Sequence, residues 1–538
     1  MRGQAADFAQ AGFGSDVNHT RRSDVNHTPP VVKLTATHDT PATLLLTASA
    51  EKAALSAGEA HTALAMISLK TSEHVRLGLG LGLWLRPVTR LPMEIVAVVD
   101  RSGSMSGAKI ATMKQTLSFL VSKGLQSGDS LAIVSFDDIV ETRLPLSTMD
   151  TGGKSKAIDA INALQPGRTT NLSGGLLQGI DLLRAPQPTG GSTRVVLLFT
   201  DGIANVGIVD GPGIVKAAQG AMVAVDCTAV DSHAQGLHRG LLEPVLDRMV
   251  EMSRPKPMTI FTFGFGSDHN EDMLRSLAGT TNGLYYYLAN VEAIPLAFAD
   301  CLGGLVAVVA QNVTLVLTPL PGVSVAHVHG SYIVRSVHGS YTAQGKLGAE
   351  GVLEVSLGDV YAEEAKDLVL QLALPALTEP TEEGACLLAA LRYYSVPASR
   401  FVTAEARLTI NRPAATPVDQ PVNIKLEEQR LRVAAAEAMA QAAQLADQGR
   451  LDEGRAQLQQ FRMMSLASPA CASANTAALL SDLDEVVAGF EDEPVYRSMG
   501  SKMSKMSAMS HAQQRSTHAT GGTYEGASKR AAKMSLFT

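Results

Sequence analysis

The sequence predicts an α/β protein with a doubly wound, mostly parallel sheet, flanked by an antiparallel β-sandwich and a C-terminal helical segment. Three observations lead to this prediction. Apolar strand-like runs alternate with helix-like runs between about residues 93 and 310. Short alternating runs lie on both sides of this region. A stretch rich in Ala, Glu, Gln and Leu, which are good helix formers, follows them.

The central region supplies the doubly wound sheet. Its expected strands are apolar almost throughout, as in strands covered on both faces, and they are Glu94–Asp100, Ser130–Phe136, Val195–Thr200, Thr259–Gly264 and Leu284–Leu288. The expected helices are Ala108–Lys123, Lys154–Ala163, Ser173–Leu183, Gly240–Met252, Asn270–Leu277 and Val291–Val309. In such a sheet, ligands bind at the carboxyl ends of the strands.

The chain divides into six parts. We expect a disordered segment at 1–30, a β segment at 31–90, the doubly wound domain at 91–310, a β-sandwich domain at 311–412, a helical hairpin at 424–492 and a basic tail rich in Ser and Met at 493–538. Neither β flank alone clearly makes a full sandwich, so we expect the two to pair into one. The charges of the tail predict a solvated surface, with a docking tail as the alternative. A helical spacing predicts a packing face for Met499, Met503, Met506 and Met509.

Composition argues against several classes of protein. The 538 residues are 45% hydrophobic, which is ample for buried cores, and the net charge of -7 argues against a nucleic-acid-binding body. We find no apolar secretory segment at the start and no run of about 20 apolar residues. The cysteines lie too far apart for a zinc ribbon or RING and fit a reducing compartment: Cys227, Cys301, Cys386 and Cys471. We therefore expect a cytoplasmic protein without a membrane span.

One stretch carries the candidate chemistry. Met93–Gly107 begins as an apolar strand and ends in a loop that contains Asp100, Ser102 and Ser104. Glycines within this loop allow the backbone to turn sharply. The Asp-x-Ser-x-Ser spacing places several hard oxygens on one loop, and such oxygens suit Mg²⁺, Mn²⁺ or Ca²⁺.

Two further stretches complete the motif. Gly167–Gly175 contains Thr170, and Phe199–Gly202 places Asp201 at the end of an apolar strand. In a doubly wound sheet all three stretches fall on one edge, at strand ends or helix starts. Three hydroxyls, two carboxylates and water would together make an octahedral oxygen site.

These three stretches resemble the von Willebrand factor A (VWA) domain and its metal-ion-dependent adhesion site. All five positions of that site are present: Asp100, Ser102, Ser104, Thr170 and Asp201. The resemblance implies that the serines and the threonine contact a divalent cation, Mg²⁺ with Mn²⁺ or Ca²⁺ as alternatives. It also implies that the aspartates bind this cation directly or through water, and that one position stays open for an Asp or Glu of a protein partner.

Further stretches are similar to the plant wavy-growth RING–VWA ubiquitin ligases: Gly264–His269, Cys301–Gly304 and Gly358–Glu364. This resemblance spans about residues 31–500, but the cysteines of a RING are missing. It therefore implies a non-enzymatic protein-binding module without catalytic residues. The alternative is a substrate-recognition component of a ubiquitin-ligase assembly whose RING is supplied in trans. An extracellular adhesion protein is a third interpretation, and it would require a signal peptide.

Individual acids of the motif have simpler interpretations. Asp100 or Asp201 alone would be expected to cap a helix or turn, and a degenerate, empty site is the main alternative to a metal site. Asp137 and Asp138 follow a strand. We expect them to be exposed turn acids, with a second cation shell as the alternative.

A serine hydrolase is the enzyme alternative. Met105 stands where the nucleophile of a G-x-S-x-G motif would have to be. The candidate histidines, His233, His238 and His269, show no identifiable pattern of acid partners. The sequence therefore favours binding over hydrolysis.

Overall fold

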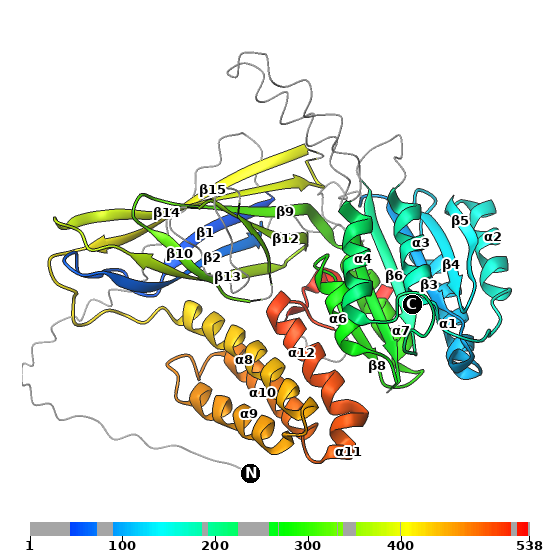
Figure 1. The fold of residues 1–538 in the computed structure, drawn as a ribbon. Coiled ribbons are helices and arrows are strands. Elements are labelled where there is room, and N and C mark those ends of the chain that lie inside the picture. The colour runs from blue at the N-terminus through cyan, green and yellow to red at the C-terminus, as the bar shows by residue number, and fades with distance from the viewer. Residues whose placement is uncertain are drawn as a thin grey trace, which may run out of the picture.

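In the computed structural model, an α/β domain, a β-sandwich and a group of C-terminal helices lie against one another (Figure 1). The structure describes residues 43–72, 90–184, 192–223, 258–266, 268–330, 332–336, 351–398, 400–517 and 524–535. The predicted fold class is confirmed in all three of its parts. The expected strands before residue 43, the expected run at 77–85 and the expected helix Gly240–Met252 lie outside the described residues.

A six-stranded sheet forms the centre of the α/β domain, in the order β5-β4-β3-β6-β7-β8. All neighbouring strands are parallel except β4 and β5. The strands are β3 (Met93–Asp100), β4 (Ser130–Phe136), β5 (Val140–Thr148), β6 (Thr193–Thr200), β7 (Met258–Phe265) and β8 (Tyr285–Leu288). The sequence does not predict β5, because this edge strand has no apolar run and Leu144 is its one buried residue.

Helices cover both faces of this sheet. One face carries α1 (Ala108–Phe119), α2 (Thr151–Asn162) and α7 (Ala293–Val306), and the other carries α3 (Leu172–Arg184), α4 (Gly211–Val223) and α6 (Glu271–Gly279). Alternate residues of β3 enter the two cores, Ile95 and Val99 on one side and Val96 and Val98 on the other. Burial on both faces explains why β3 is apolar from Ile95 to Val99.

Two helices of this domain differ from the sequence prediction. The helix expected at Val291–Val309 ends at Val306, and the chain continues almost at once into β9 (Val308–Pro319). No turn residue marks this change, so the apolar pattern alone could not place it. Helix α4 was missed because it contains three glycines and a proline, which are poor helix formers.

The β-sandwich combines strands from both sides of the α/β domain. One sheet contains β1 (Leu44–Ala50), β2 (His61–Thr71), β13 (Ala365–Leu374) and β10 (Ser324–Val328). The other contains β11 (Ile333–Ser336), β12 (Leu353–Tyr361), β9, β14 (Thr381–Ser395) and β15 (Arg400–Arg412). The pairing of β2 with β13 runs from Lys70↔Ala365 to His61↔Leu374. The two sheets share one core, so the α/β domain is inserted between strands of the sandwich.

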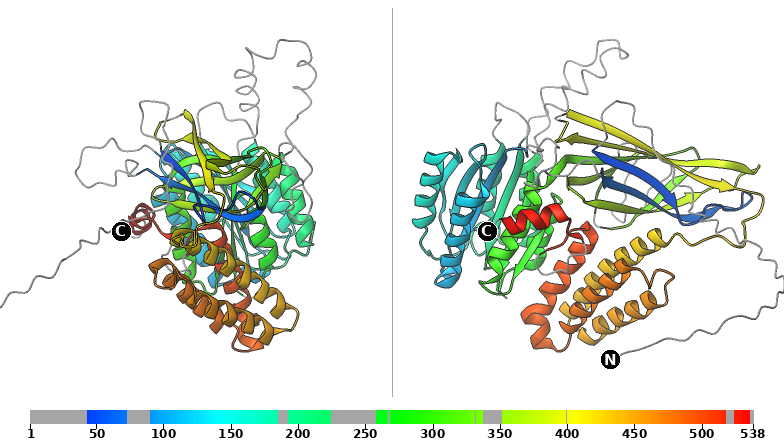
Figure 2. Two further views of the ribbon diagram at one scale, coloured as in Figure 1. Left: turned by 90° about the vertical axis from the view of Figure 1, so that its left-hand side faces the viewer. Right: turned by 180° about the vertical axis from the view of Figure 1, so that it is seen from behind.

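The C-terminal helices begin with α8 (Ile424–Asp447), α9 (Leu451–Leu466) and α10 (Ala474–Ala488), which share a core. After α11 (Glu493–Val495), helix α12 (Ser501–Gln513) lies between α8 and the α/β domain (Figure 1). Helix α13 (Ala527–Ser535) packs against α7, as seen from behind in Figure 2. Within the described ranges, no helix has the length and apolar character needed to cross a membrane.

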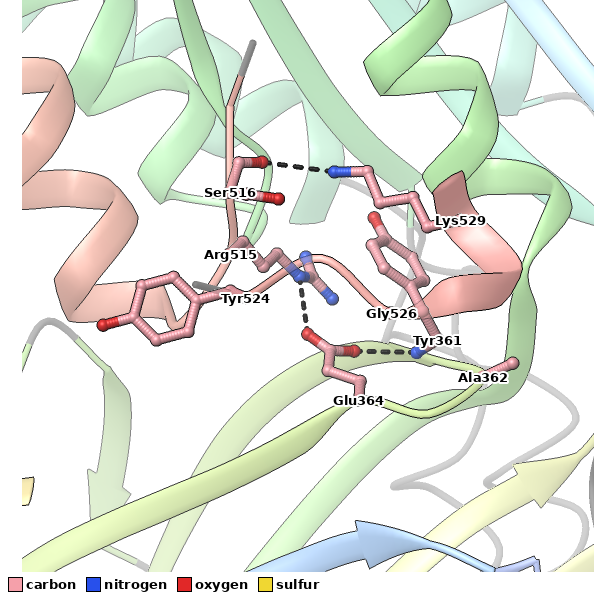
Figure 3. Close-up of a pocket in the computed structure, with 8 residues that line it drawn as sticks. All are labelled: Tyr361, Ala362, Glu364, Arg515, Ser516, Tyr524, Gly526 and Lys529. Atoms are coloured by element: carbon pink, nitrogen blue, oxygen red, sulfur yellow. Dashed lines mark hydrogen bonds and ion pairs between the residues drawn. The ribbon is translucent and has the colours of Figure 1, made fainter. Parts of the chain in front are cut away.

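Several basic residues of the tail are buried, whereas the sequence predicted a solvated surface. Arg515 Nε donates to Glu364 Oε1 at 3.0 Å, and its guanidinium lies 4.3 Å from the centre of the Tyr361 ring (Figure 3). Lys529 Nζ donates to Asp300 Oδ2 on α7 at 3.0 Å. Four basic side chains of this tail are at most 5% exposed: Lys502, Lys505, Arg515 and Lys529. The prediction failed because the partners of these charges lie on distant segments of the chain.

Candidate metal centre

Three loops meet at one edge of the six-stranded sheet. β3 ends at Asp100, β6 ends directly before Asp201, and Thr170 lies just before α3. Because β3 and β6 are parallel neighbours, their carboxyl ends face the same edge. The Gly103 N–H donates to the Arg168 carbonyl at 3.1 Å and joins two of the loops. The structure thus brings the predicted loops together.

Asp100 is fully buried beneath its loop. Its Oδ1 accepts the Ser102 N–H at 2.8 Å, and its Oδ2 accepts the Thr200 hydroxyl at 2.6 Å. Burial raises the pKa of Asp100 from its ordinary 3.8 to about 6, against the opposing effect of these hydrogen bonds. The ionised form of this carboxyl group is therefore stabilised by any positive charge placed near it.

Hydroxyls and a carboxylate form a short chain of hydrogen bonds at the site. The hydroxyl oxygens of Ser102 and Ser104 are 3.1 Å apart, and the Ser104 hydroxyl donates to Asp201 Oδ1 at 2.7 Å. Asp201 is buried, while Ser104 is exposed at the protein surface. Oxygens from two loops are thus within hydrogen-bond distance at a position that solvent reaches.

Thr170 is held by the loop that follows β6. Its N–H donates to Asn205 Oδ1 at 2.8 Å, and its carbonyl accepts the N–H groups of Asn205 and Val206 at 3.1 and 3.3 Å. A Cβ atom on Gly202 would lie 3.5 Å from Thr170 Oγ1 and 3.7 Å from Ser104 Oγ. The two hydroxyls therefore face one small space, which a glycine at position 202 leaves open.

Lys109, near the start of α1, supplies positive charge at the site. Its Nζ lies 2.5 Å from Asp201 Oδ2, and its side chain is 34% exposed. Asp100 and Asp201 carry two negative charges when both are ionised. One lysine does not balance these two charges, which leaves a net negative charge at the site when both carboxyl groups are ionised.

The donor set fits a hard divalent cation. Hydroxyl and carboxylate oxygens are the ligands that Mg²⁺, Mn²⁺ and Ca²⁺ prefer. Among the residues that the structure describes, no group of three His, Cys, Asp or Glu side chains is arranged to hold a metal. The hydroxyls complete this donor set in place of further acids. All five predicted residues lie at the site, and their role as ligands stays a prediction.

Three residues of the site were not predicted: Lys109, Thr200 and Asn205. Thr200 is the last residue of β6 and directly precedes Asp201, so its position at the strand end was a usable signal. The roles of the lysine and the asparagine depend on the direction of their side chains, which no local pattern of the sequence indicates.

Asp137 and Asp138 have different environments. Asp137 is buried, and its Oδ1 accepts hydrogen bonds from Arg101 at 2.7 Å and from the Ile139 N–H at 2.9 Å. Its carbonyl also accepts the Asn171 N–H at 2.7 Å. Asp138 is exposed. The expectation of an exposed turn acid is therefore right for Asp138 and wrong for Asp137, which braces the loop that carries Thr170.

The serine-hydrolase alternative would need a free serine hydroxyl near a histidine. The hydroxyls of Ser102 and Ser104 instead form hydrogen bonds to each other and to Asp201. Of the candidate histidines, His269 is buried, and its Nε2 lies 2.6 Å from the Tyr285 hydroxyl. Burial lowers the pKa of His269 to about 4. His233 and His238 lie outside the described residues. In the described part of the chain, the Ser102 and Ser104 hydroxyls are therefore hydrogen-bonded to each other, and the Ser104 hydroxyl is hydrogen-bonded to the Asp201 carboxylate.

The central part of the chain matches a known family. Residues 94–300 match the family model described as von Willebrand factor type A domain. The resemblance that the three loop stretches carry is thereby confirmed.

Curated relatives share part of the chain. It is 27% identical over 294 residues to E3 ubiquitin-protein ligase WAV3 of Arabidopsis thaliana. This aligned region covers 54% of this chain and 32% of the relative. It is 31% identical over 134 residues to inter-alpha-trypsin inhibitor heavy chain H1 of Sus scrofa. Here the aligned region covers 24% of this chain and 15% of the relative. The chain therefore spans about a third or less of the length of these relatives.

Two solved structures show a similar fold over most of the chain. A von Willebrand factor type A protein from Catenulispora acidiphila has a TM-score of 0.59 at 14% identity, covering 86% of this chain and 96% of its own. The ArnB paralog VWA2 from Sulfolobus acidocaldarius has a TM-score of 0.53 at 13% identity, covering 88% and 98%. At these identities the likeness concerns the fold alone.

Proposed function

We propose that this chain, whose residues 94–300 are a von Willebrand factor type A domain, captures an acidic residue of a partner protein through a divalent cation. A VWA domain indicates a protein–protein interaction, and the finer proposal concerns how that interaction is made. One observation carries it: three hydroxyls and two carboxylates converge at the carboxyl edge of the sheet. We propose Mg²⁺ as the cation, with Mn²⁺ or Ca²⁺ as alternatives, and binding in place of catalysis.

The chemistry of the donors explains why an acidic partner is favoured. A divalent cation held by neutral hydroxyls and two carboxylates would keep Lewis-acid character toward a further oxygen ligand. Lys109 already pairs with Asp201, which reduces the negative charge that the protein itself supplies. Ser104 is exposed, so a ligand can approach the site from solvent. A carboxylate from the partner would add both the missing ligand and the missing negative charge.

A substrate-recognition component of a ubiquitin-ligase assembly is the second candidate. The similarity to the ligase WAV3 covers 294 residues, which is longer than the VWA domain at residues 94–300. It therefore includes sequence beyond the metal-site domain. The four cysteines of this sequence are widely separated and do not have the spacing of a RING, and this candidate function takes its RING in trans.

A capture experiment with the full chain tests the first proposal. The immobilised chain is expected to retain a partner from a cell extract in Mg²⁺ and to release it in EDTA. Asp201→Ala is expected to lose this capture, whereas Asp138→Ala, a matched change of an exposed acid beside the site, is expected to retain it. Capture that survives EDTA, or that Asp201→Ala retains, would contradict the proposal.

The same experiment separates the second candidate from the first. Mass spectrometry of the EDTA eluate is expected to identify a RING protein or a ubiquitin-conjugating enzyme if the chain serves a ligase assembly. An eluate that contains a metal-dependent partner but no protein of the ubiquitin pathway would contradict the second candidate and leave the first intact.

A further inference from the structure

Exposed aliphatic side chains gather at the edge of the VWA domain that carries the candidate metal site. In the described part of residues 94–300, five large apolar side chains are exposed, and four of them lie in the loops beside the site. The fifth, Leu296, lies on α7. The four, which we call the aliphatic rim, are Ile139 (57% exposed), Ile203 (60%), Ile208 (36%) and Val209 (50%). Contiguous exposed apolar patches mark interaction surfaces, and what groups these four side chains is that their loops share one edge of the domain.

Three members of the aliphatic rim come from the loop after β6. Ile203 directly follows Gly202, which lies beside the hydroxyls of the metal site. The Ile208 N–H donates to Ser173 Oγ at 2.9 Å, and the intervening Ala204 is buried in the core. The loop is thus fixed by hydrogen bonds and packing while its isoleucines point outward. A surface ordered in advance loses little entropy on binding.

The fourth member, Ile139, comes from the turn after β4. The carbonyl of Asp137 in this turn accepts the Asn171 N–H at 2.7 Å. A Cβ atom on Gly174 would lie 2.9 Å from Val140 Cγ2, so the turn also touches the start of α3. Both groups of the aliphatic rim therefore border the short segment that carries Thr170.

Positive charge lies beside this apolar surface. Lys109 is partly exposed at the site. Arg168 is also exposed, and its backbone carbonyl accepts the Gly103 N–H. Together with a divalent cation, these groups favour a negatively charged ligand. An acidic group alone would leave the aliphatic rim in water.

We propose that the partner binds through a segment in which one acidic residue is flanked by aliphatic side chains. The acid would meet the metal site, and the flanking Leu, Ile, Val or Met side chains would cover the aliphatic rim. This inference rests on the proposed function, because the metal site sets the position of the acid.

A display library of random 12-residue peptides, selected on the full chain in Mg²⁺ and eluted with EDTA, tests the inference. Eluted peptides are expected to carry an Asp or Glu with aliphatic residues close by on either side. Ile203→Ser is expected to weaken their binding about tenfold, as loss of a largely buried aliphatic contact predicts. Leu296→Ser, a change at a 49% exposed aliphatic residue on α7 outside the aliphatic rim, is expected to leave binding unchanged.

The outcomes distinguish this inference from the proposed function. EDTA-eluted acidic peptides without aliphatic neighbours would overturn the inference and leave the metal-dependent capture of an acid standing. Equal binding to the wild type and to Ile203→Ser would do the same. A selection that yields no EDTA-sensitive peptides would contradict both.

Discussion

Replacing Asp100 with Asn is expected to stabilise the chain in EDTA although it removes a proposed metal ligand. Asp100 is fully buried, and its two oxygens accept hydrogen bonds from the Ser102 N–H and the Thr200 hydroxyl. An asparagine has the same shape. Its carbonyl oxygen can accept the Ser102 N–H, and its amide can donate to the Thr200 hydroxyl oxygen. The substitution therefore removes a buried charge and keeps both contacts, with the direction of the Thr200 hydrogen bond reversed.

The size of this effect follows from the pKa of Asp100. Burial raises this pKa from 3.8 to about 6, so the folded chain holds the proton more tightly than the unfolded chain does. The free-energy cost of ionising Asp100 is absent below pH 3.8, grows as the pH rises, and is complete above about pH 6. At pH 8 it corresponds to about 3 kcal/mol, and at pH 5 to about half of that.

Thermal unfolding of the full chain in EDTA measures this effect. For a VWA domain of about 200 residues, about 3 kcal/mol predicts that Asp100→Asn raises the Tm of that domain by about 6–12 °C at pH 8, with a clearly smaller rise at pH 5. Asp138→Asn, the matched change at an exposed acid, is expected to leave Tm unchanged. A lower Tm for Asp100→Asn at pH 8, or the same shift at both pH values, would refute the reasoning.

Three further predictions concern the tail and the site. Arg515→Ala is expected to destabilise the chain by about 3–5 kcal/mol because Glu364 loses a buried partner. Thermal unfolding checks this, with the exposed Arg530→Ala as its control. Lys109→Met is expected to tighten Mn²⁺ binding about tenfold, since a positive charge leaves the site; unchanged or weaker binding by calorimetry would count against it. Mn²⁺ affinity is expected to fall about tenfold per pH unit below about pH 6, where Asp100 is protonated, and a flat calorimetric profile between pH 5 and 7.5 would contradict this.

Much of the fold was predictable because burial leaves a direct trace in the sequence. The strand β3 is covered on both faces, so its interior from Ile95 to Val99 is an unbroken apolar run, which is the pattern expected of a strand buried on both sides. The edge strand β5 and the glycine-containing helix α4 escaped prediction, because one is mostly polar and the other is built from poor helix formers. Their structure depends on tertiary packing.

The tail shows where local patterns fail. The spacing of its methionines predicted a packing face, and Met506 and Met509 do lie in the core of the α/β domain, while Met499 is exposed. Its basic residues were expected in solvent, yet Lys529 pairs with Asp300, more than two hundred residues away in the sequence. A charge pattern read locally cannot show a partner at that separation.

The candidate site was predictable to the extent that strand ends position it. Asp100 and Asp201 were placed together because parallel neighbouring strands end at the same edge. Lys109 and Asn205 belong to the site only through the direction of their side chains, which becomes visible once the loops are folded. The order of the motifs along the sequence therefore predicts where the site lies. The structure adds the lysine that pairs with Asp201 and the asparagine that holds Thr170.

Calorimetric titration of the full chain with Mn²⁺ tests the central claim most directly. We expect one Mn²⁺ bound per wild-type chain, no binding to Asp201→Ala, and wild-type binding to Asp138→Ala. Wild-type protein that takes up no Mn²⁺, or equal uptake by Asp201→Ala, would contradict the claim that the five converging residues form a cation site.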